Sequence, residues 1–270
     1  MASIQKQIKR ILSAQITDIQ LLENGWVSLA LHAPEIAANA KPGQFLQVQT
    51  GSGADPLLRR PFSIAGITGN HDVCLLIRVV GRGTELLSNK RLGDSLNIIG
   101  PLGRGFPEIS GNVWTVAGGT GLAPFLFLAK TKSDTQQITP FYGACTATDC
   151  RFLELPLYRF LMDQAPPFIT TEDGKLGARG LVTDVLENQF HTNPGKPAAI
   201  FTCGPLPMMR RVRDLAVQHN VPCHVSLEAF MGCGFGACMG CVVPGIPKPY
   251  FHVCEDGPVF ASGDIDWDRF

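Results

Sequence analysis

The stretch Met231-Gly-Cys-Gly-Phe-Gly-Ala-Cys-Met-Gly-Cys241 carries three cysteines in the spacing C-x4-C-x2-C, and Cys254 follows after a proline-rich connection. This is the plant-type spacing of a [2Fe–2S] cluster, in which four thiolates hold two irons. The glycines between the cysteines let the backbone approach an anionic cluster and turn N–H groups toward its sulfurs. The pattern therefore predicts a cluster with four ligands: Cys233, Cys238, Cys241 and Cys254.

Two other interpretations of these cysteines remain open, a structural zinc site and a disulfide-bonded loop. Zinc usually prefers C-x2-C pairs on two separate knuckles, whereas three of these cysteines share one glycine-rich loop. The chain has nine cysteines, an odd number, and those outside the motif are scattered. That pattern fits a reducing compartment best, so we expect a cytoplasmic protein.

Length and charge narrow the class of protein. The chain has 270 residues, more than one typical domain, so we expect two domains and a small additional module. Its 23 basic and 23 acidic residues balance, which argues against nucleic acid or a membrane surface as a partner. Residues 1–15 lack the apolar core of a signal peptide, and no later apolar run approaches the length that spans a bilayer.

The first half of the chain consists of short apolar runs separated by Gly, Pro, Asn and Asp. We expect strands in five of these runs: 16–22, 26–31, 44–49, 73–80 and 94–99. Evenly spaced short strands are typical of an antiparallel barrel or sandwich. Only 83–90 indicates a helix in this half.

One further strand, around residues 58–64, contains Arg60-Pro-Phe-Ser63. Alternate side chains share one face of a strand, so Arg60 and Phe62 are expected together, in reach of a phosphate and a planar ring. The same residues would also fit the plain end of a barrel strand. After the next strand, Gly81-Arg-Gly-Thr84 leads into the helix and offers N–H groups to a pyrophosphate. Thr84 would equally fit an ordinary N-cap.

After residue 111 the pattern changes to alternating strands and helices, which predicts a parallel α/β domain. The expected strands are 113–117, 138–143, 168–171 and 198–203, and the expected helices are 125–130, 152–163, 181–190 and 208–216. The domain boundaries that follow are 1–110 for the barrel, 111–222 for the α/β domain and 223–270 for the cysteine module.

Two turns of the α/β domain are candidate nucleotide contacts. Gly118-Gly-Thr-Gly-Leu-Ala-Pro124 joins a strand to a helix, where bare backbone accepts a dinucleotide pyrophosphate. Pro124 replaces the third glycine of the usual G-x-G-x-x-G fingerprint, so an ordinary turn remains an alternative. The later strand ends in Cys203-Gly-Pro205, and Cys203 is either a nicotinamide contact or a small buried residue.

Together these motifs resemble the ferredoxin–NADP reductase superfamily. The resemblance implies a flavin-binding antiparallel barrel, a Rossmann-like nucleotide domain and, in this chain, a small C-terminal [2Fe–2S] module. It implies FAD contacts at Arg60, Pro61, Phe62, Ser63, Ile77, Arg78, Val79, Gly83 and Thr84. It implies NAD contacts at Gly118, Gly119, Thr120, Gly121, Cys203, Gly204 and Pro205. In that superfamily the Arg meets the FAD pyrophosphate, the aromatic lies against the flavin, and the Ser points at the reactive flavin nitrogen.

Three further stretches accompany this order of parts: Thr171-Glu-Asp-Gly174, Val225-Ser-Leu-Glu228 and Cys254-Glu-Asp-Gly-Pro-Val-Phe260. With them, the chain closely resembles the electron-transfer subunits of type B dihydroorotate dehydrogenase. The resemblance implies an oxidoreductase subunit of pyrimidine biosynthesis. It would pass electrons between NAD+ and an FMN-containing catalytic subunit through FAD and the cluster, in a heterotetramer with two of each subunit. The alternative is the flavin and iron–sulfur subunit of another NAD(P)H-dependent reductase, of the ferredoxin or sulfur type. Cys145 stands where that family usually has Arg, which weakens what is implied for the adenosine end of the nucleotide.

No side chain is expected to act as a general acid or base, because the cofactors carry the redox chemistry and the substrate reacts on the partner subunit. The histidines show no metal-ligand spacing and are expected at the surface or satisfied in the core: His32, His71, His191, His219, His224 and His252.

Overall fold

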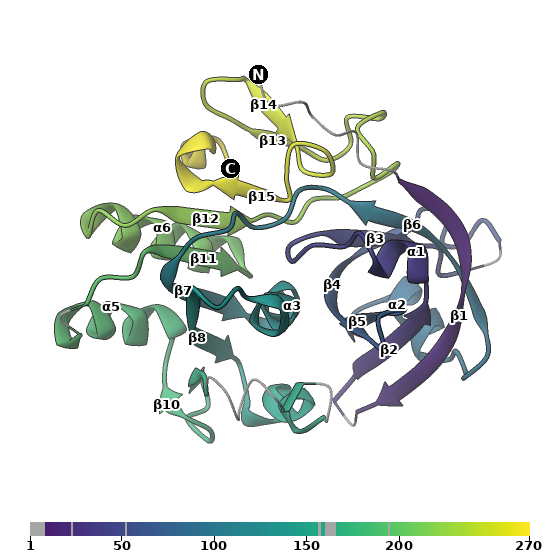
Figure 1. The fold of residues 1–270 in the computed structure, drawn as a ribbon, viewed down its shortest axis with the longest axis horizontal. Coiled ribbons are helices and arrows are strands. Elements are labelled where there is room, and N and C mark those ends of the chain that lie inside the picture. Colours follow the sequence, from purple (N-terminus) through teal and green to yellow (C-terminus); the bar gives the residue numbers. More distant parts are fainter. Residues whose placement is uncertain (1–8, 23, 52, 156–157, 160–165, 194) are drawn as a thin grey trace.

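The computed structural model describes residues 9–22, 24–51, 53–155, 158–159, 166–193 and 195–270. Figure 1 shows a barrel beside a sheet flanked by helices, with the C-terminal segment beyond both. Within the described ranges, we find no helix that combines the length and the apolar character needed to cross a membrane.

Six antiparallel strands close the barrel in the order β1-β2-β5-β4-β3-β6. They are β1 (Arg10–Leu21), β2 (Trp26–His32), β3 (Phe45–Val48), β4 (Arg60–Thr68), β5 (Asp72–Arg78) and β6 (Ser95–Leu102). Two short helices, α1 (Pro34–Ala37) and α2 (Arg82–Ser88), lie in the connections. Apolar side chains at alternate strand positions fill the interior, as a closed barrel requires. The predicted antiparallel barrel is confirmed.

Strand β1 begins six residues earlier than the sequence predicted, at Arg10 rather than at residue 16. Its first half pairs with β6 and its second half pairs with β2. The side chains of Arg10, Ile11 and Leu12 are largely exposed or only partly buried, so they carry little of the apolar alternation that marks a strand. Backbone pairing with β6 extends this strand, and only Leu12 and Ala14 of the added residues pack against or within the barrel core.

A second sheet has the order β10-β9-β8-β7-β11-β12-β15 and is parallel except for its last strand. Its members are β7 (Gly111–Gly118), β8 (Gln136–Ala144), β9 (Phe168–Thr171), β10 (Ala178–Arg179), β11 (Ala199–Cys203), β12 (Cys223–Ser226) and β15 (Val259–Ala261). The helices between them are η1 (Gly119–Leu122), α3 (Ala123–Thr131), η2 (Ala147–Glu154), α5 (Val182–Thr192) and α6 (Leu206–Gln218). The predicted Rossmann-like part is confirmed. The helix expected at 152–163 is replaced at its start by the 3-10 helix η2, and its residues 156–157 and 160–163 lie outside the described residues.

Helix α3 lies between the sheet and the barrel (Figure 1). Phe125 and Leu126 of this helix share one core with Trp26 and Leu76 of the barrel. At the end of the helix, Lys130 Nζ donates to the carbonyl oxygen of Ile67 at 2.9 Å. The apolar face of α3 thereby fixes the barrel against the sheet.

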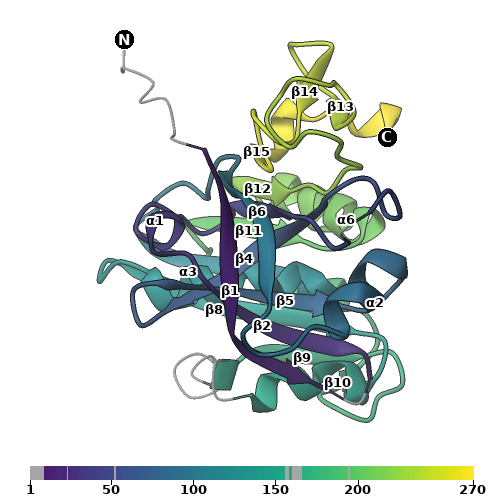
Figure 2. The same ribbon diagram turned by 90° about the vertical axis from the view of Figure 1, so that its right-hand side faces the viewer.

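The C-terminal segment adds a two-stranded sheet, β13 (Val242–Pro244) with β14 (Tyr250–His252), and the short helices η3 (Ser262–Asp264) and η4 (Trp267–Arg269). Figure 2 shows β13 and β14 at one end of the molecule, beyond β12. The segment also supplies β12 and β15 to the parallel sheet, and Cys241 and Cys254 share a core with Trp114 and Ile200. The cysteine module is therefore joined to the sheet by backbone pairing and by packing.

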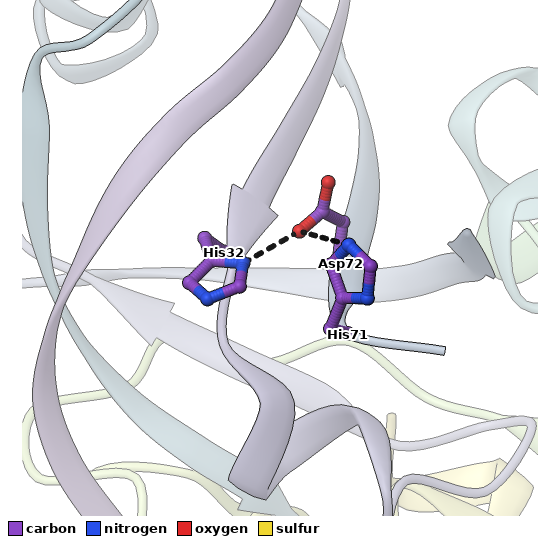
Figure 3. A group of neighbouring side chains, drawn as sticks. All are labelled: His32, His71 and Asp72. Carbon is purple, nitrogen blue, oxygen red and sulfur yellow. Dashed lines mark hydrogen bonds and ion pairs between the residues drawn. The ribbon is translucent and has the colours of Figure 1, made fainter. Parts of the chain in front are cut away.

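Three polar side chains meet at the surface of the barrel (Figure 3). His32 of β2 pairs across strands with Asp72 of β5, and His71 precedes Asp72 in the turn. Asp72 Oδ1 lies 3.0 Å from His32 Nδ1 and 3.9 Å from His71 Nε2, while Thr17 Oγ1 donates to Asp72 Oδ2 at 2.8 Å. Spacing along the chain could not show this group, because cross-strand pairing creates it. We therefore interpret this group as a set of polar cross-strand contacts that stabilise neighbouring barrel strands.

Candidate functional site

One cleft, with a volume of about 1610 Å³, is lined by residues of the barrel, of the second sheet and of the cysteine loop (residues 231–241). Pockets for one small molecule usually measure about 300–1,000 Å³, so this cleft has room for more than one cofactor. The predicted site residues on its walls are Arg60, Pro61, Phe62, Ser63, Ile77, Arg78, Thr84, Gly118, Gly119, Thr120, Cys203, Pro205 and Cys238. Gly204 lines a smaller cavity of about 390 Å³ that shares wall residues with the cleft.

The barrel wall of the cleft is built around Arg60. Its Nη1 donates to the carbonyl of Leu58 at 2.8 Å, which holds the side chain and leaves its other donors for a ligand. A Cβ on Gly83 would lie 3.1 Å from Arg60 Nε and 3.3 Å from Thr50 Oγ1, so glycine lets α2 approach both. Thr50 is buried, and its hydroxyl has no partner among the described residues. This grouping fits a bound phosphate.

Thr84 holds the loop before α2. Its hydroxyl accepts from the N–H groups of Val80 and Gly81 at 2.9 and 3.2 Å and donates to the carbonyl of Gly81 at 2.9 Å. Because α2 begins at Arg82, Thr84 is the third helical residue rather than the N-cap. Val79, the remaining predicted contact of this region, follows β5 directly, and its N–H donates to the carbonyl of Gly25 at 2.8 Å.

Arg78 closes the cleft where barrel and sheet meet. Its Nη1 lies 2.8 Å from Asp149 Oδ1 in η2, and its guanidinium carbon lies 5.4 Å from the ring centre of Trp26. The ion pair joins the barrel to the α/β part beside the predicted flavin site, whereas the cation–π contact lies within the barrel. Trp26 is a cleft residue that the sequence did not reveal, because it stands in an ordinary barrel strand.

The two predicted nucleotide turns pack backbone against backbone. A Cβ on Gly121 would collide with the carbonyl of Cys203 and lie 2.8 Å from the nitrogen of Gly204. Gly204 has φ +150°, and a Cβ there would lie 2.9 Å from the nitrogen of Gly118. Glycine is thus required on both sides of this contact. The turns present bare backbone to the cleft, which fits a pyrophosphate.

Replacing Gly121 by Ala is expected to push these turns apart and to slow flavin reduction by NADH about 10- to 100-fold, since a 1 Å misplacement of a reactant can cost about 100-fold. FAD content should stay unchanged, because the barrel is not touched. The matched control is Gly66→Ala in β4, where an added Cβ meets no described atom within 4 Å. Stopped-flow absorbance of the flavin measures both. Equal rates in Gly121→Ala and wild type would contradict this role for the turn.

Cys203 ends β11 on the cleft wall and is only 2% exposed. Burial raises the pKa of the Cys203 thiol, so the side chain is neutral at physiological pH. Cys203 is thus a small buried residue on the cleft wall, and its contact with the nicotinamide stays a prediction. Among the wall residues that the sequence did not predict are Glu228 and Thr170, and the buried hydroxyl of Thr170 has no partner within the described part of the chain.

The cysteine loop brings four thiols together and aims N–H groups at them. Cys241 Sγ lies 3.2 Å from Cys254 Sγ, and the N–H of Gly236 points to Cys254 Sγ at 3.1 Å. The N–H groups of Phe235 and Ala237 point to Cys233 Sγ at 3.4 and 3.3 Å, and that of Cys233 points to Cys238 Sγ at 3.4 Å. Positive φ angles at Gly234, Gly236 and Met239 produce this inward turn.

The electrostatics of the loop suit thiolate ligands. Burial by itself raises the pKa of Cys233, but backbone N–H groups of Phe235, Cys238 and Ala237 outweigh it and bring the pKa to about 7. Burial, with the neighbouring Cys241, raises the pKa of Cys254 to about 12. A pair of thiols in contact cannot both ionise without a cation between them. All nine cysteines are free thiols in the described structure, so the disulfide interpretation has no support there.

Comparisons with known proteins agree with this arrangement. A family model described as the iron-sulfur cluster binding domain of dihydroorotate dehydrogenase B matches residues 228–266, and an oxidoreductase NAD-binding domain matches residues 115–214. Among solved structures, the NADH-dependent reduced ferredoxin-NADP oxidoreductase is similar with a TM-score of 0.82 and 28% identity, over 94% of this chain and 90% of that one.

Curated relatives match nearly the whole chain. The dihydroorotate dehydrogenase B (NAD(+)) electron transfer subunit of Desulforamulus reducens is 38% identical over 97% of this chain and 100% of its own. The subunit of the same name from Geobacillus thermodenitrificans is 37% identical over 88% of this chain and 91% of its own. With this identity over most of both chains, the chain belongs to the family of electron transfer subunits of dihydroorotate dehydrogenase B.

Proposed function

We propose that this chain is the electron transfer subunit of an NAD-dependent dihydroorotate dehydrogenase, passing electrons between NAD+ and an FMN-containing catalytic subunit through FAD and a [2Fe–2S] cluster. The observation that carries the proposal is the single cleft whose walls come from the barrel, the nucleotide turns and the cysteine loop. Family membership supports the same function and does not favour another NAD(P)H-dependent reductase.

Each wall has a distinct task in this proposal. Arg60 would hold the FAD pyrophosphate, while Phe62 and Ser63 border the flavin. The turn at 118–121 would receive the NAD pyrophosphate, and Cys203 would lie near the nicotinamide. Four cysteines would hold the two irons. When bound, the cofactors supply hydride exchange at the flavin and single-electron exchange at the cluster, and the protein positions them.

The surroundings of the cluster loop support a partner subunit. Cys238 is exposed, and Phe235 and Met239 beside it are 42% and 48% exposed. Large apolar side chains that remain in water next to a redox centre suit a docking surface. We propose that the FMN-containing catalytic subunit covers this loop, that the assembly contains two of each subunit, and that it resides in the cytoplasm.

A spectrum of the purified chain tests the cofactors, because flavin bands and reddish-brown cluster absorbance should appear together. Dihydroorotate should then bleach the complex with the co-purifying flavoprotein under anaerobic conditions, and NAD+ should restore the colour. Colourless protein with stoichiometric zinc would overturn the proposal. Bleaching by reduced ferredoxin or NADPH, without any response to dihydroorotate, would favour the other reductase class instead.

A further inference from the structure

Two buried glutamines of the barrel have opposite surroundings. Gln44 is satisfied, since its Nε2 donates to the carbonyl of Gly103 at 2.8 Å and its Oε1 accepts from the N–H of Lys41 at 2.8 Å. Gln47, three residues along, is 0% exposed, yet neither its Nε2 nor its Oε1 has a hydrogen-bond partner among the described residues. A buried amide without partners is unfavourable, so the Gln47 side chain has a donor and an acceptor left for a group outside the chain.

The side chain of Gln47 lies against the cysteine loop. A Cβ on Gly234 would lie 2.5 Å from Gln47 Cγ and 3.1 Å from Gln47 Nε2. Gly234 has φ +80° and stands directly after the predicted ligand Cys233. Only glycine fits here, because the amide occupies the space of a side chain. The loop whose N–H groups point to the sulfurs of Cys233, Cys238 and Cys254 is thus in contact with the Gln47 side chain.

The position of Gln47 in the barrel also connects it to the flavin wall. In β3 it pairs with Pro61 of β4, and its neighbour Leu46 pairs with Phe62. Alternate residues share a face, so Gln47 lies on the side of Phe45, which belongs to the same core as Cys241 and Cys254. The amide therefore stands between the predicted flavin strand and the predicted cluster ligands.

We propose that Gln47 is a positioning residue for the iron–sulfur cluster, whose amide N–H group donates to a cluster sulfur and raises the reduction potential of the cluster. This inference rests on the cluster of the proposed function. Hydrogen bonds to the sulfurs stabilise the more negative, reduced state, and they are a main determinant of cluster potentials. The bound cluster would supply the hydrogen-bond acceptor that the Gln47 amide lacks among the described residues.

Replacement of Gln47 by Met, which has similar length and no N–H donor, tests the proposal in the FAD- and cluster-loaded full chain. The expected result is an unchanged iron and sulfide content with a lower midpoint potential in an EPR-monitored redox titration. A loss of about tenfold in the equilibrium constant for one-electron reduction corresponds to a midpoint potential lower by about 59 mV. Gln47→Asn withdraws the amide by one methylene with a smaller packing change and should lower the potential in the same direction.

The matched control is Gln44→Met, which removes a buried amide that is already hydrogen-bonded within the barrel. It should lower the unfolding temperature and leave the potential unchanged. Wild-type potentials in both Gln47 variants would overturn the inference while leaving the proposed function intact. A wild-type protein without labile sulfide would instead remove the proposed function itself, so the two failures are distinguishable.

Discussion

The Cys254→Ser variant is expected to lose the labile sulfide, the visible cluster absorbance and the EPR signal of the reduced protein. The thiolate is the form that binds iron, and a serine hydroxyl stays protonated where a metal-bound thiol does not. Cys254 is 1% exposed and its Sγ lies 3.2 Å from that of Cys241, so no water can take its place without opening the loop. Iron and sulfide analysis with EPR measures the loss.

FAD content and NADH-dependent dye reduction should survive in Cys254→Ser. The cysteine module is also held by the pairing of β12 with β15 and by a core shared with Trp114, neither of which depends on the cluster. Cys74→Ser is the matched control, because Cys74 is also buried and its Sγ meets only Thr68 Oγ1, at 3.6 Å, among its described hydrogen bonds. A full cluster in Cys254→Ser would show that another residue is the fourth ligand.

The parts of the fold that were predicted correctly from the sequence are those marked by local patterns. The short apolar runs of β2 and β5 and the change of rhythm after Gly111 each involve neighbours in the chain. The cysteine spacing is local for the same reason. In contrast, β12 and β15 join the second sheet through pairing with strands far away in the chain or beyond the cysteine loop, which no local pattern shows.

Contacts between elements far apart in the chain, including much of the lining of the cleft, depend on tertiary packing and were not predicted from the sequence. Thr50 and Gln47 are buried residues that no motif marked, and only the packing of α2 and of the cysteine loop places them beside Gly83 and Gly234. Trp26 reaches the cleft because the barrel closes beside η2, where Arg78 meets Asp149. The sequence showed the motifs that are defined by the spacing of glycines or cysteines. It did not show single residues that another element contributes to the same site.

Arg60→Ala is expected to weaken FAD binding by about 10- to 100-fold, because a hydrogen bond to a charged group contributes about 1.5–3 kcal/mol and each 1.4 kcal/mol is about tenfold in affinity. The side chain is fixed on the cleft wall by the carbonyl of Leu58 and touches the space beside Gly83 and Thr50, where a phosphate would be received. Fluorescence quenching on adding FAD to the deflavinated chain measures the dissociation constant.

Two companion variants show whether the loss comes from geometry or from charge. Arg60→Lys keeps the positive charge but lacks the planar fork that binds phosphate through two parallel bonds, so an intermediate affinity is expected. Arg82→Ala removes a charge from the first residue of α2, where Arg82 forms an exposed ion pair with Glu85 at 3.4 Å, and should leave FAD affinity unchanged. If Arg60→Ala and Arg82→Ala bound FAD equally well, the pyrophosphate would have to lie elsewhere in the cleft. Equal affinities in Arg60→Lys and wild type would show that charge alone, rather than the fork fixed by Leu58, binds the phosphate.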